Sequence, residues 1–299
     1  MMTRHDLVNL MESRPHWLLD GAVGTELERR GFQTSLPFWT AFAAVESPQL
    51  LKDIHLDYLQ AGADIITANT FRISRYLFEK ADQLSDFLPT LHKTSELVTA
   101  CQVDSRRPLI AASLAPLEDC YRPDLVPSRK TLQSYHRMQI EALCQFKFDF
   151  ILAETINSGI EAEIICSACQ EMDVALIVSL VTNGKGQLLS GERLDEVLQE
   201  ITRYSPAAIS LNCRSTTDLG NDAVILEQHY EGIKGIYANA PGSHQSAGIW
   251  KILPHANHIL DDFTRRLLSM DIRIIGGCCG TNPTLIKAIG RVLGNSESS

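Results

Sequence analysis

The chain has 299 residues, of which 44% are hydrophobic and 21% are charged, and its formal net charge is −9 at pH 7. This composition is close to the average of soluble globular proteins, so it allows a sizeable core and argues against a disordered chain. The negative charge, without any local cluster of Lys or Arg, argues against nucleic acid or acidic lipid as a partner and favours a small-molecule substrate.

The N-terminal segment Met1–Arg14 mixes charged and apolar residues and lacks the continuous apolar stretch of a signal peptide. No later segment approaches the roughly 20 apolar residues that a membrane-spanning helix needs. We therefore expect a cytoplasmic protein with no membrane partner. The eight cysteines are then expected to be reduced thiols or metal ligands, not a disulfide framework. The oligomeric state is left open, because the outward helix faces show no long apolar seam.

Short β-branched apolar runs recur along the chain, and each is typical of a strand buried on both faces. The predicted strands are Trp17–Asp20, Ala63–Asn69, Leu109–Ser113, Phe148–Glu154, Ala175–Val181, Ala207–Asn212, Gly235–Asn239 and Ile272–Gly277.

Amphipathic segments with helical spacing lie between these runs, for example from Pro48 to Gly62. Eight strands with intervening helices predict an α/β fold, a parallel (β/α)8 TIM barrel that spans residues 1–299 as a single domain. The pattern is weakest in Ala115–Arg129, expected to be a long loop, and in Thr216–Glu231, where the helical period is poor. The tail Asn295–Ser299 is expected to be loose.

Barrel enzymes place their chemistry at the carboxyl ends of the strands. Polar residues or cysteines follow most of the predicted strands, which indicates a site at the barrel mouth. They are Asp20, Asn69, Thr70, Glu154, Asn212, Cys213, Asn239, Cys278 and Cys279.

Three of these residues are cysteines, and they suggest a metal. Cys278 and Cys279 are adjacent, and a disulfide between neighbours strains the peptide. Together with Cys213 they offer three thiolates at strand ends, the number of protein ligands that a catalytic zinc site commonly uses while its fourth position stays open. An isolated cysteine is more often a small buried hydrophobe, and we interpret the five others in that way: Cys101, Cys120, Cys144, Cys166 and Cys169.

Four segments resemble the signatures of the homocysteine S-methyltransferase family, and the resemblance covers nearly the entire chain. They are Asp20–Leu27 (DGAVGTEL), Thr67–Phe71 (TANTF), Asn212-Cys213 and Gly276–Thr281 (GGCCGT). The resemblance implies a zinc-dependent (β/α)8 barrel that transfers a methyl group from a small donor to the thiol of homocysteine, forming methionine. It makes Cys213, Cys278 and Cys279 the ligands of one zinc ion per chain, and the catalytic residues.

The resemblance also implies how the acceptor's amino-acid end is bound. Asp20 and Glu154 would accept hydrogen bonds from its ammonium group, and the backbone amides around Gly21 and Ala22 would hold its carboxylate. The residues themselves allow other interpretations, because Asp is a favoured helix cap and a carboxylate such as Glu154 can be part of a buried ion pair. Ala22 stands where the family often has a second glycine.

Asn69 and Asn212, which end two of the matching strands, are expected to contribute to substrate binding as well. Arg214 is either a cation that favours the thiolate form of its neighbour Cys213 or an outward-pointing surface residue.

The methyl donor is expected to bind at the same barrel mouth, because little chain follows the eighth strand. The segment Leu36–Ala41 resembles that of single-domain members that use S-methylmethionine, which is our first choice of donor; S-adenosylmethionine and betaine are alternatives. A positively charged methyl donor would be attracted to an aromatic face such as that of Trp39. The alternative interpretation is that Trp39 is a core residue.

Two other functions are compatible with the sequence. Gly276 and Gly277 could mark a barrel phosphate site, in a metal-independent lyase or isomerase that leaves the cysteines unexplained. Alternatively, the barrel binds zinc without catalysis. Selenohomocysteine or another small thiol remains an alternative acceptor.

Overall fold

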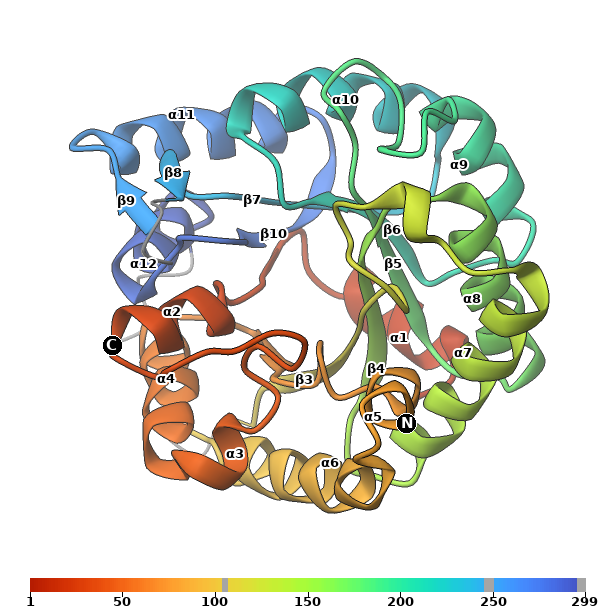
Figure 1. Ribbon diagram of the computed structural model, residues 1–299. Helices are drawn as coiled ribbons and strands as arrows, with labels where there is room; N and C mark the ends of the chain where they lie inside the picture. The colour runs from red at the N-terminus through yellow and green to blue at the C-terminus, as the bar shows by residue number, and fades with distance from the viewer. Residues whose placement is uncertain (104–106, 245–249, 295–299) are drawn as a thin grey trace.

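Eight parallel strands form one sheet in the computed structural model, which describes residues 1–103, 107–244 and 250–294 (Figure 1). Their order is β1-β10-β7-β6-β5-β4-β3-β2, and a parallel bridge between Leu19 and Ile65 joins the two edges into a barrel. The strands are β1 (Trp17–Leu18), β2 (Ile65–Ala68), β3 (Leu109–Leu114), β4 (Phe150–Ile156), β5 (Leu176–Leu180), β6 (Ala208–Asn212), β7 (Ile233–Ala238) and β10 (Ile272–Gly277).

Helices surround this barrel, as Figure 1 shows, and the predicted (β/α)8 fold is confirmed. The helices are α1 (Arg4–Glu12), α2 (Val23–Arg29), α3 (Ala43–Glu46), α4 (Pro48–Gln60), α5 (Arg75–Lys80), α6 (Leu84–Thr99), η1 (Pro123–Leu125), α7 (Arg129–Cys144), α8 (Gly159–Glu171), α9 (Leu194–Thr202), α10 (Thr216–His229), α11 (Ala256–Leu268) and α12 (Pro283–Val292).

The strands are apolar on both faces because each face packs against a different part of the core. In β4, Phe150 and Leu152 belong to the cluster inside the barrel, whereas Ile151 and Ala153 belong to the cluster between the sheet and the helices. This alternation follows from the two-residue period of a strand. It explains why the sequence shows continuous apolar runs at these positions.

Helix α1 lies at the amino-terminal end of the barrel. Its buried residues Leu7 and Met11 join the interior cluster, and the backbone N–H of Met2, just before the helix, donates to the carbonyl of Asp149 at the start of β4. The opposite end, where the strands finish, carries the polar residues. The fold therefore concentrates the chemistry at the carboxyl ends of the strands.

Two elements differ from the sequence expectation. Residues 216–229 form a regular helix, α10, although the periodicity is poor; its inner face carries the buried Asp222, which accepts hydrogen bonds from the backbone N–H groups of Gly184 and Gly186. The short hairpin β8 (Gly242–His244) and β9 (Trp250–Ile252) was not predicted. The tail Asn295–Ser299 lies outside the described residues.

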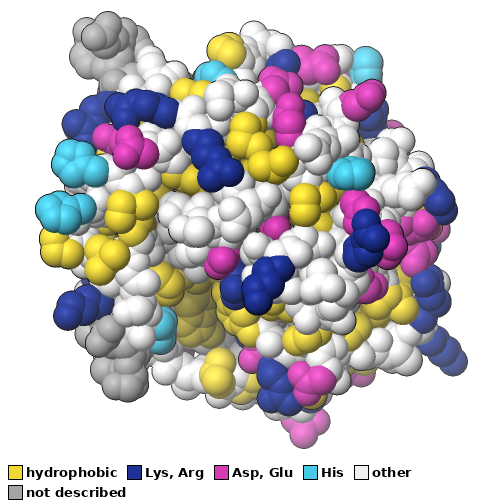
Figure 2. Space-filling model, turned by 90° about the horizontal axis from the view of Figure 1, so that it is seen from above, with side chains coloured by type: hydrophobic (Ala, Val, Ile, Leu, Met, Phe, Trp, Pro, Cys, Tyr) yellow, Lys and Arg dark blue, Asp and Glu magenta, His cyan; other side chains and the backbone are white. Residues whose placement is uncertain are grey.

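The surface mixes charges of both signs. On the face in Figure 2, basic and acidic side chains are interspersed and form no continuous basic patch. Within the described parts of the chain, no helix has the length and apolar character needed to cross a bilayer.

Candidate active site

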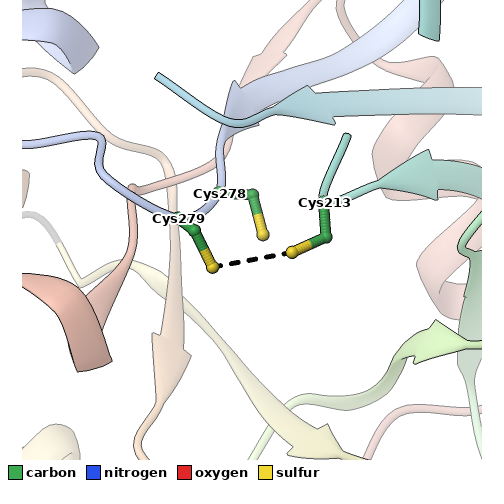
Figure 3. Close-up of side chains that lie close together, drawn as sticks. All are labelled: Cys213, Cys278 and Cys279. Carbon is green, nitrogen blue, oxygen red and sulfur yellow. Dashed lines mark hydrogen bonds between the residues drawn. The ribbon is translucent and has the colours of Figure 1, made fainter. Parts of the chain in front are cut away.

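Three cysteines meet at the barrel mouth. Cys213 follows β6, Cys278 and Cys279 follow β10, and their side chains point toward one another (Figure 3). The three sulfur atoms all lie within 4.8 Å of one another, and 3.5 Å separates the Cys213 and Cys279 sulfurs. None of the three forms a disulfide. Residues 66 positions apart in the sequence are thus brought into one cluster.

This cluster fits a metal site. Two thiolates about 2.3 Å from a tetrahedral zinc ion would be separated by about 3.8 Å, close to the 3.5 Å between Cys213 and Cys279. Soft sulfur ligands favour zinc over hard cations such as magnesium or calcium. Cys213, Cys278 and Cys279 would hold the ion and leave a fourth position for substrate.

The sulfur cluster also concentrates negative charge. Hydrogen bonds from Cys278 and Cys279 hold the pKa of Cys213 well below its usual range, with a smaller contribution from Tyr121. The interaction with Cys213 in turn raises the pKa of Cys278 and of Cys279. One thiolate is therefore stabilised at Cys213 by its neighbours, as expected for groups that share a charge.

Two strand ends at the site adopt an unusual backbone conformation. Cys213 and Thr155 have φ angles of 60°, in the left-handed region that residues with a β-carbon rarely occupy. Asn212 links them, because its side-chain oxygen accepts from the Thr155 N–H at 3.1 Å and its amide nitrogen donates to the Thr155 hydroxyl at 2.9 Å. Such conformations are held by the surrounding structure and occur often at functional sites.

Asp20 and Glu154 form a pair of carboxylates without a basic partner in the described part of the chain. The oxygens of Asp20 accept hydrogen bonds from the backbone N–H and hydroxyl of Thr67, and Glu154 accepts one from the Ser113 hydroxyl. No ion pair joins either carboxylate to a described Lys, Arg or His. The interpretation of Glu154 as half of a buried ion pair is therefore wrong. Ala22, and not Asp20, is the N-cap of α2.

Electrostatics make this pair receptive to a cation. Burial raises the pKa of Asp20, and the charge of Glu154 raises it further. Burial likewise raises the pKa of Glu154 to about 7, with a contribution from the charge of Cys213. A bound ammonium group would offset the desolvation and the mutual repulsion of the two carboxylates.

Gly21 and Ala22 lie directly after Asp20 and line the cavity. The Ala22 N–H already donates to the Thr281 hydroxyl at 3.1 Å. A β-carbon on Gly21 would lie 2.7 Å from the same hydroxyl and 2.8 Å from Tyr58, so this position requires glycine for packing. Ala22 has a φ of −64°, which any residue can adopt.

Asn69 fixes the loop before α3. Its amide nitrogen donates to the Thr40 carbonyl at 2.8 Å, and its oxygen accepts from the Thr40 hydroxyl at 3.1 Å. This contact helps hold Trp39 at the cavity wall, where the indole N–H donates to Glu28 at 2.8 Å. Trp39 therefore faces the cavity and is not simply a core residue.

These groups surround one cavity of about 830 Å³. That volume lies within the range of about 300 to 1,000 Å³ found for ligand sites. The cavity is lined by the three cysteines together with Asp20, Gly21, Ala22, Asn69 and Glu154. Asn212 is not part of the lining, because Thr155 and Ser179 occupy its side chain.

The glycines of the eighth strand have a packing role. A β-carbon on Gly276 would lie 2.7 Å from Leu19, and one on Gly277 would overlap Thr281. Close packing against Leu19 accounts for Gly276 and packing against Thr281 accounts for Gly277, so a phosphate site is not needed to explain these glycines.

Comparisons with known proteins agree with this geometry. The model of the family described as "Homocysteine S-methyltransferase" matches residues 17–293. The chain belongs to the homocysteine S-methyltransferase family. A homocysteine S-methyltransferase of Escherichia coli is 29% identical over 311 residues, covering 97% of this chain and 99% of the relative. A selenocysteine Se-methyltransferase of Brassica oleracea is 25% identical over 335 residues, covering 97% and 92%.

A solved structure supports the same assignment. The homocysteine methyltransferase MmuM of Escherichia coli, in its metallated form, superposes with a TM-score of 0.80 at 25% identity, covering 95% of this chain and 98% of that one. The predicted homocysteine S-methyltransferase resemblance is confirmed, and membership of this family supports zinc as the metal for the cysteine cluster.

Several cavity residues were not singled out from the sequence. Tyr121 places its hydroxyl 2.8 Å from the Cys213 sulfur, and Thr67 holds Asp20 through two hydrogen bonds. Arg72 and Glu28 also line the cavity. Thr67 lies within a motif that was recognised, but Tyr121 lies in the long loop 115–129, whose path no periodicity predicts. Arg214 lines the cavity as well, 3.5 Å from Asp218, and so does not point outward.

Proposed function

We propose that this protein transfers a methyl group from a small, positively charged donor to the sulfur of homocysteine, forming methionine. The observation that carries the proposal is the position of Asp20 and Glu154 in the same cavity as three clustered cysteine sulfurs; neither carboxylate has an ion-pair partner among the described residues. An amino acid with a thiol matches both features. S-methylmethionine is the proposed donor, with S-adenosylmethionine and betaine as alternatives.

The residues divide the work of binding and orientation. Asp20 and Glu154 would bind the ammonium group of homocysteine, and the backbone around Gly21 would face its carboxylate. Asn69 and Asn212 would support the site through the loop at Thr40 and the strand end at Thr155. Cys213, Cys278 and Cys279 would hold zinc. When bound, zinc lowers the pKa of a coordinated thiol and so supplies the thiolate that acts as nucleophile.

The reaction is balanced without a further reactant. With a sulfonium donor such as S-methylmethionine, a new bond forms between the acceptor sulfur and the donor methyl carbon, while the bond from that carbon to the donor sulfur breaks. The electron pair stays on the donor sulfur, so a sulfonium becomes a neutral thioether. The acceptor thiol proton is released. With S-methylmethionine, both products are methionine.

We further propose that residues 1–299 form a single barrel domain and that the protein works in the cytoplasm. Small-molecule substrates fit the cavity at the barrel mouth and the mixed surface charge.

A methyl-transfer assay tests the function directly. Reduced, zinc-replete protein is incubated with homocysteine and, separately, with S-methylmethionine, S-adenosylmethionine or betaine, and zinc is measured on the same sample. The expected result is methionine formed in proportion to bound zinc. About one zinc ion per chain without methionine from any donor would contradict the proposal and favour a non-catalytic barrel or another acceptor such as selenohomocysteine.

A further inference from the structure

Among the described residues, one cation in the cavity, Arg72, has no hydrogen-bond or ion-pair partner. Arg72 follows β2 and lines the cavity. No hydrogen bond or ion pair joins its guanidinium to any residue in the described part of the chain, and its Nε atom is shielded from solvent without an acceptor. Its nearest aromatic contact is loose, with the guanidinium carbon 5.7 Å from the centre of the Phe71 ring. A shielded donor without an acceptor is costly, so a ligand atom is expected there.

The neighbouring carboxylate does not neutralise this cation. Arg72 contributes only weakly to lowering the pKa of Glu118. Glu118 itself accepts from Lys80 Nζ and from the Tyr76 hydroxyl, both at 2.6 Å. Arg214, the other cavity arginine, does have an ion-pair partner, because its guanidinium lies 3.5 Å from the carboxylate of Asp218. Arg72 therefore retains its charge for a ligand.

Arg72 lies within electrostatic range of the sulfur cluster. Burial raises the pKa of Cys120 to about 12, the charge of Cys213 raises it further, and Arg72 lowers it. Cys120 thus lies within electrostatic range of both Arg72 and Cys213, and all three residues line the same cavity. A small molecule bound to Arg72 would therefore occupy the same cavity as the cysteine cluster.

A shielded carboxylate oxygen, Glu28 Oε2, lies in the helix that follows the neighbouring strand β1. Glu28 lies in α2, after β1, and Arg72 lies after β2, the strand joined to β1 through Leu19 and Ile65. One oxygen of Glu28 accepts from the Trp39 indole at 2.8 Å and from Thr34 at 3.1 Å. Its other oxygen, Oε2, is shielded and accepts no hydrogen bond from any residue that the structure describes.

We propose that Arg72 binds the carboxylate of the methyl donor and that Glu28 Oε2, beside Trp39, binds the positive part. The donor is then a zwitterion that carries both a carboxylate and a positively charged centre. This inference rests on the proposed function, because it concerns the second substrate of the same reaction. Asp20 and Glu154 are assigned to the acceptor, so the two substrates use different charged groups. Arg72 is a specificity residue and takes no part in the bond changes.

The test compares two donors that differ only at the carboxylate. Wild type, Arg72→Met and Arg72→Lys are assayed with homocysteine and either S-methylmethionine or its carboxamide. A hydrogen bond to a charged group is worth about 1.5 to 3 kcal/mol, which corresponds to about 10- to 100-fold. Wild type is expected to prefer the carboxylate donor by about that factor in kcat/KM. Arg72→Met is expected to lose most of this preference, and Arg72→Lys to keep part of it.

Controls separate this effect from a general loss of structure. The KM for homocysteine and the zinc content are expected to stay unchanged in Arg72→Met. Arg75→Met is the matched control, because Arg75 lies outside the cavity and faces Glu79 at 3.9 Å; it is expected to behave like wild type. Glu28→Gln keeps a hydrogen-bond acceptor for Trp39 but removes the negative charge. It is therefore expected to weaken the binding of both methyl donors by the same factor.

The outcomes distinguish the two proposals. An Arg72→Met enzyme that retains the wild-type preference between the two donors overturns the role of Arg72, and so does an equal loss with both donors. Wild-type protein that forms no methionine with any of the three donors overturns the proposed function itself.

Discussion

The Trp39 ring occupies the space that a β-carbon on Gly24 would need. Gly24 lies in the first turn of α2, and the ring that covers it forms part of the cavity wall. Helix α2 therefore packs closely against the loop before α3, and this contact lies where we expect the methyl donor to bind.

Replacing Gly24 by Ala is expected to displace this ring. Overpacking commonly destabilises a protein by about 1 to 3 kcal/mol, and displacement of Trp39 should also raise the KM for the donor. Thermal unfolding and donor kinetics measure the two effects. In a Trp39→Leu background the same substitution should cost much less, because neighbouring residues are not additive. An equal cost in both backgrounds would show that the ring is not the obstacle.

The metal assignment predicts the behaviour of Cys278→Ala. This substitution leaves two of the three thiolates, so the purified protein should lose most of its zinc and all measurable turnover. Metal content by mass spectrometry and the methyl-transfer assay provide the check. The control is Cys144→Ala, at a half-buried cysteine at the end of α7, which should retain both its zinc and its methyl-transfer activity. A fully metallated and active Cys278→Ala protein would exclude the cluster as the zinc site.

The raised pKa of Glu154 predicts that binding of the acceptor depends on pH. Burial raises its pKa to about 7, so the carboxylate is charged above that pH and becomes neutral as the pH falls below it. Binding of an ammonium group should therefore weaken below about pH 7. Product inhibition by methionine is a suitable measurement, because methionine has no thiol proton to lose.

The variant Glu154→Gln tests the same residue at fixed pH. It should retain zinc, weaken methionine binding by about 10- to 100-fold, as expected for a lost charged hydrogen bond, and remove the pH dependence near 7. Glu171→Gln changes an exposed carboxylate paired with Arg137 and should have no effect. Loss of zinc with unchanged methionine affinity would instead assign Glu154 to structural support.

The contact between Tyr121 and Cys213 predicts that removing the Tyr121 hydroxyl changes the pKa of the Cys213 thiol. Its hydroxyl lies 2.8 Å from the Cys213 sulfur and helps lower the pKa of that thiol. In reduced, metal-free Tyr121→Phe, the pKa of Cys213 should therefore rise, and alkylation of this residue by iodoacetamide should require higher pH. Mass spectrometry of the peptide containing Cys213 measures the rate. An unchanged pH profile would show that the hydroxyl does not stabilise the thiolate.

The barrel could be predicted because buried parallel strands leave a strong signal. The run Ile272–Gly277 coincides with β10, and the other strands are found within a few residues of their predicted positions. Helix α10 was less clear because Asp222 on its inner face interrupts the apolar pattern. The hairpin β8–β9 gave no signal because Gly242–His244 is exposed and lacks a core-facing side.

The site could be predicted where it depends on strand ends. The three cysteines were expected together because the carboxyl ends of barrel strands converge, and the structure brings them together. Tyr121 was not foreseen, since its contact with Cys213 spans 92 residues and depends on the path of a loop. Arg72 and Glu28 were missed for a related reason: the sequence does not show that a charged group lacks an ion-pair partner, and this is recognised only from the positions of the described neighbours in space.

Strand β10 lies between β1 and β7 and is the last of the eight to leave the ribosome. The two sulfurs of Cys278 and Cys279 arrive with it, so a growing chain carries only one of the three metal ligands until its final barrel strand is in place. Metal uptake is thereby coupled to completion of the barrel, and a ligand that binds only the closed form stabilises it by mass action. Zinc occupancy of a preparation consequently reports how many molecules have closed correctly as well as how many are ready to react.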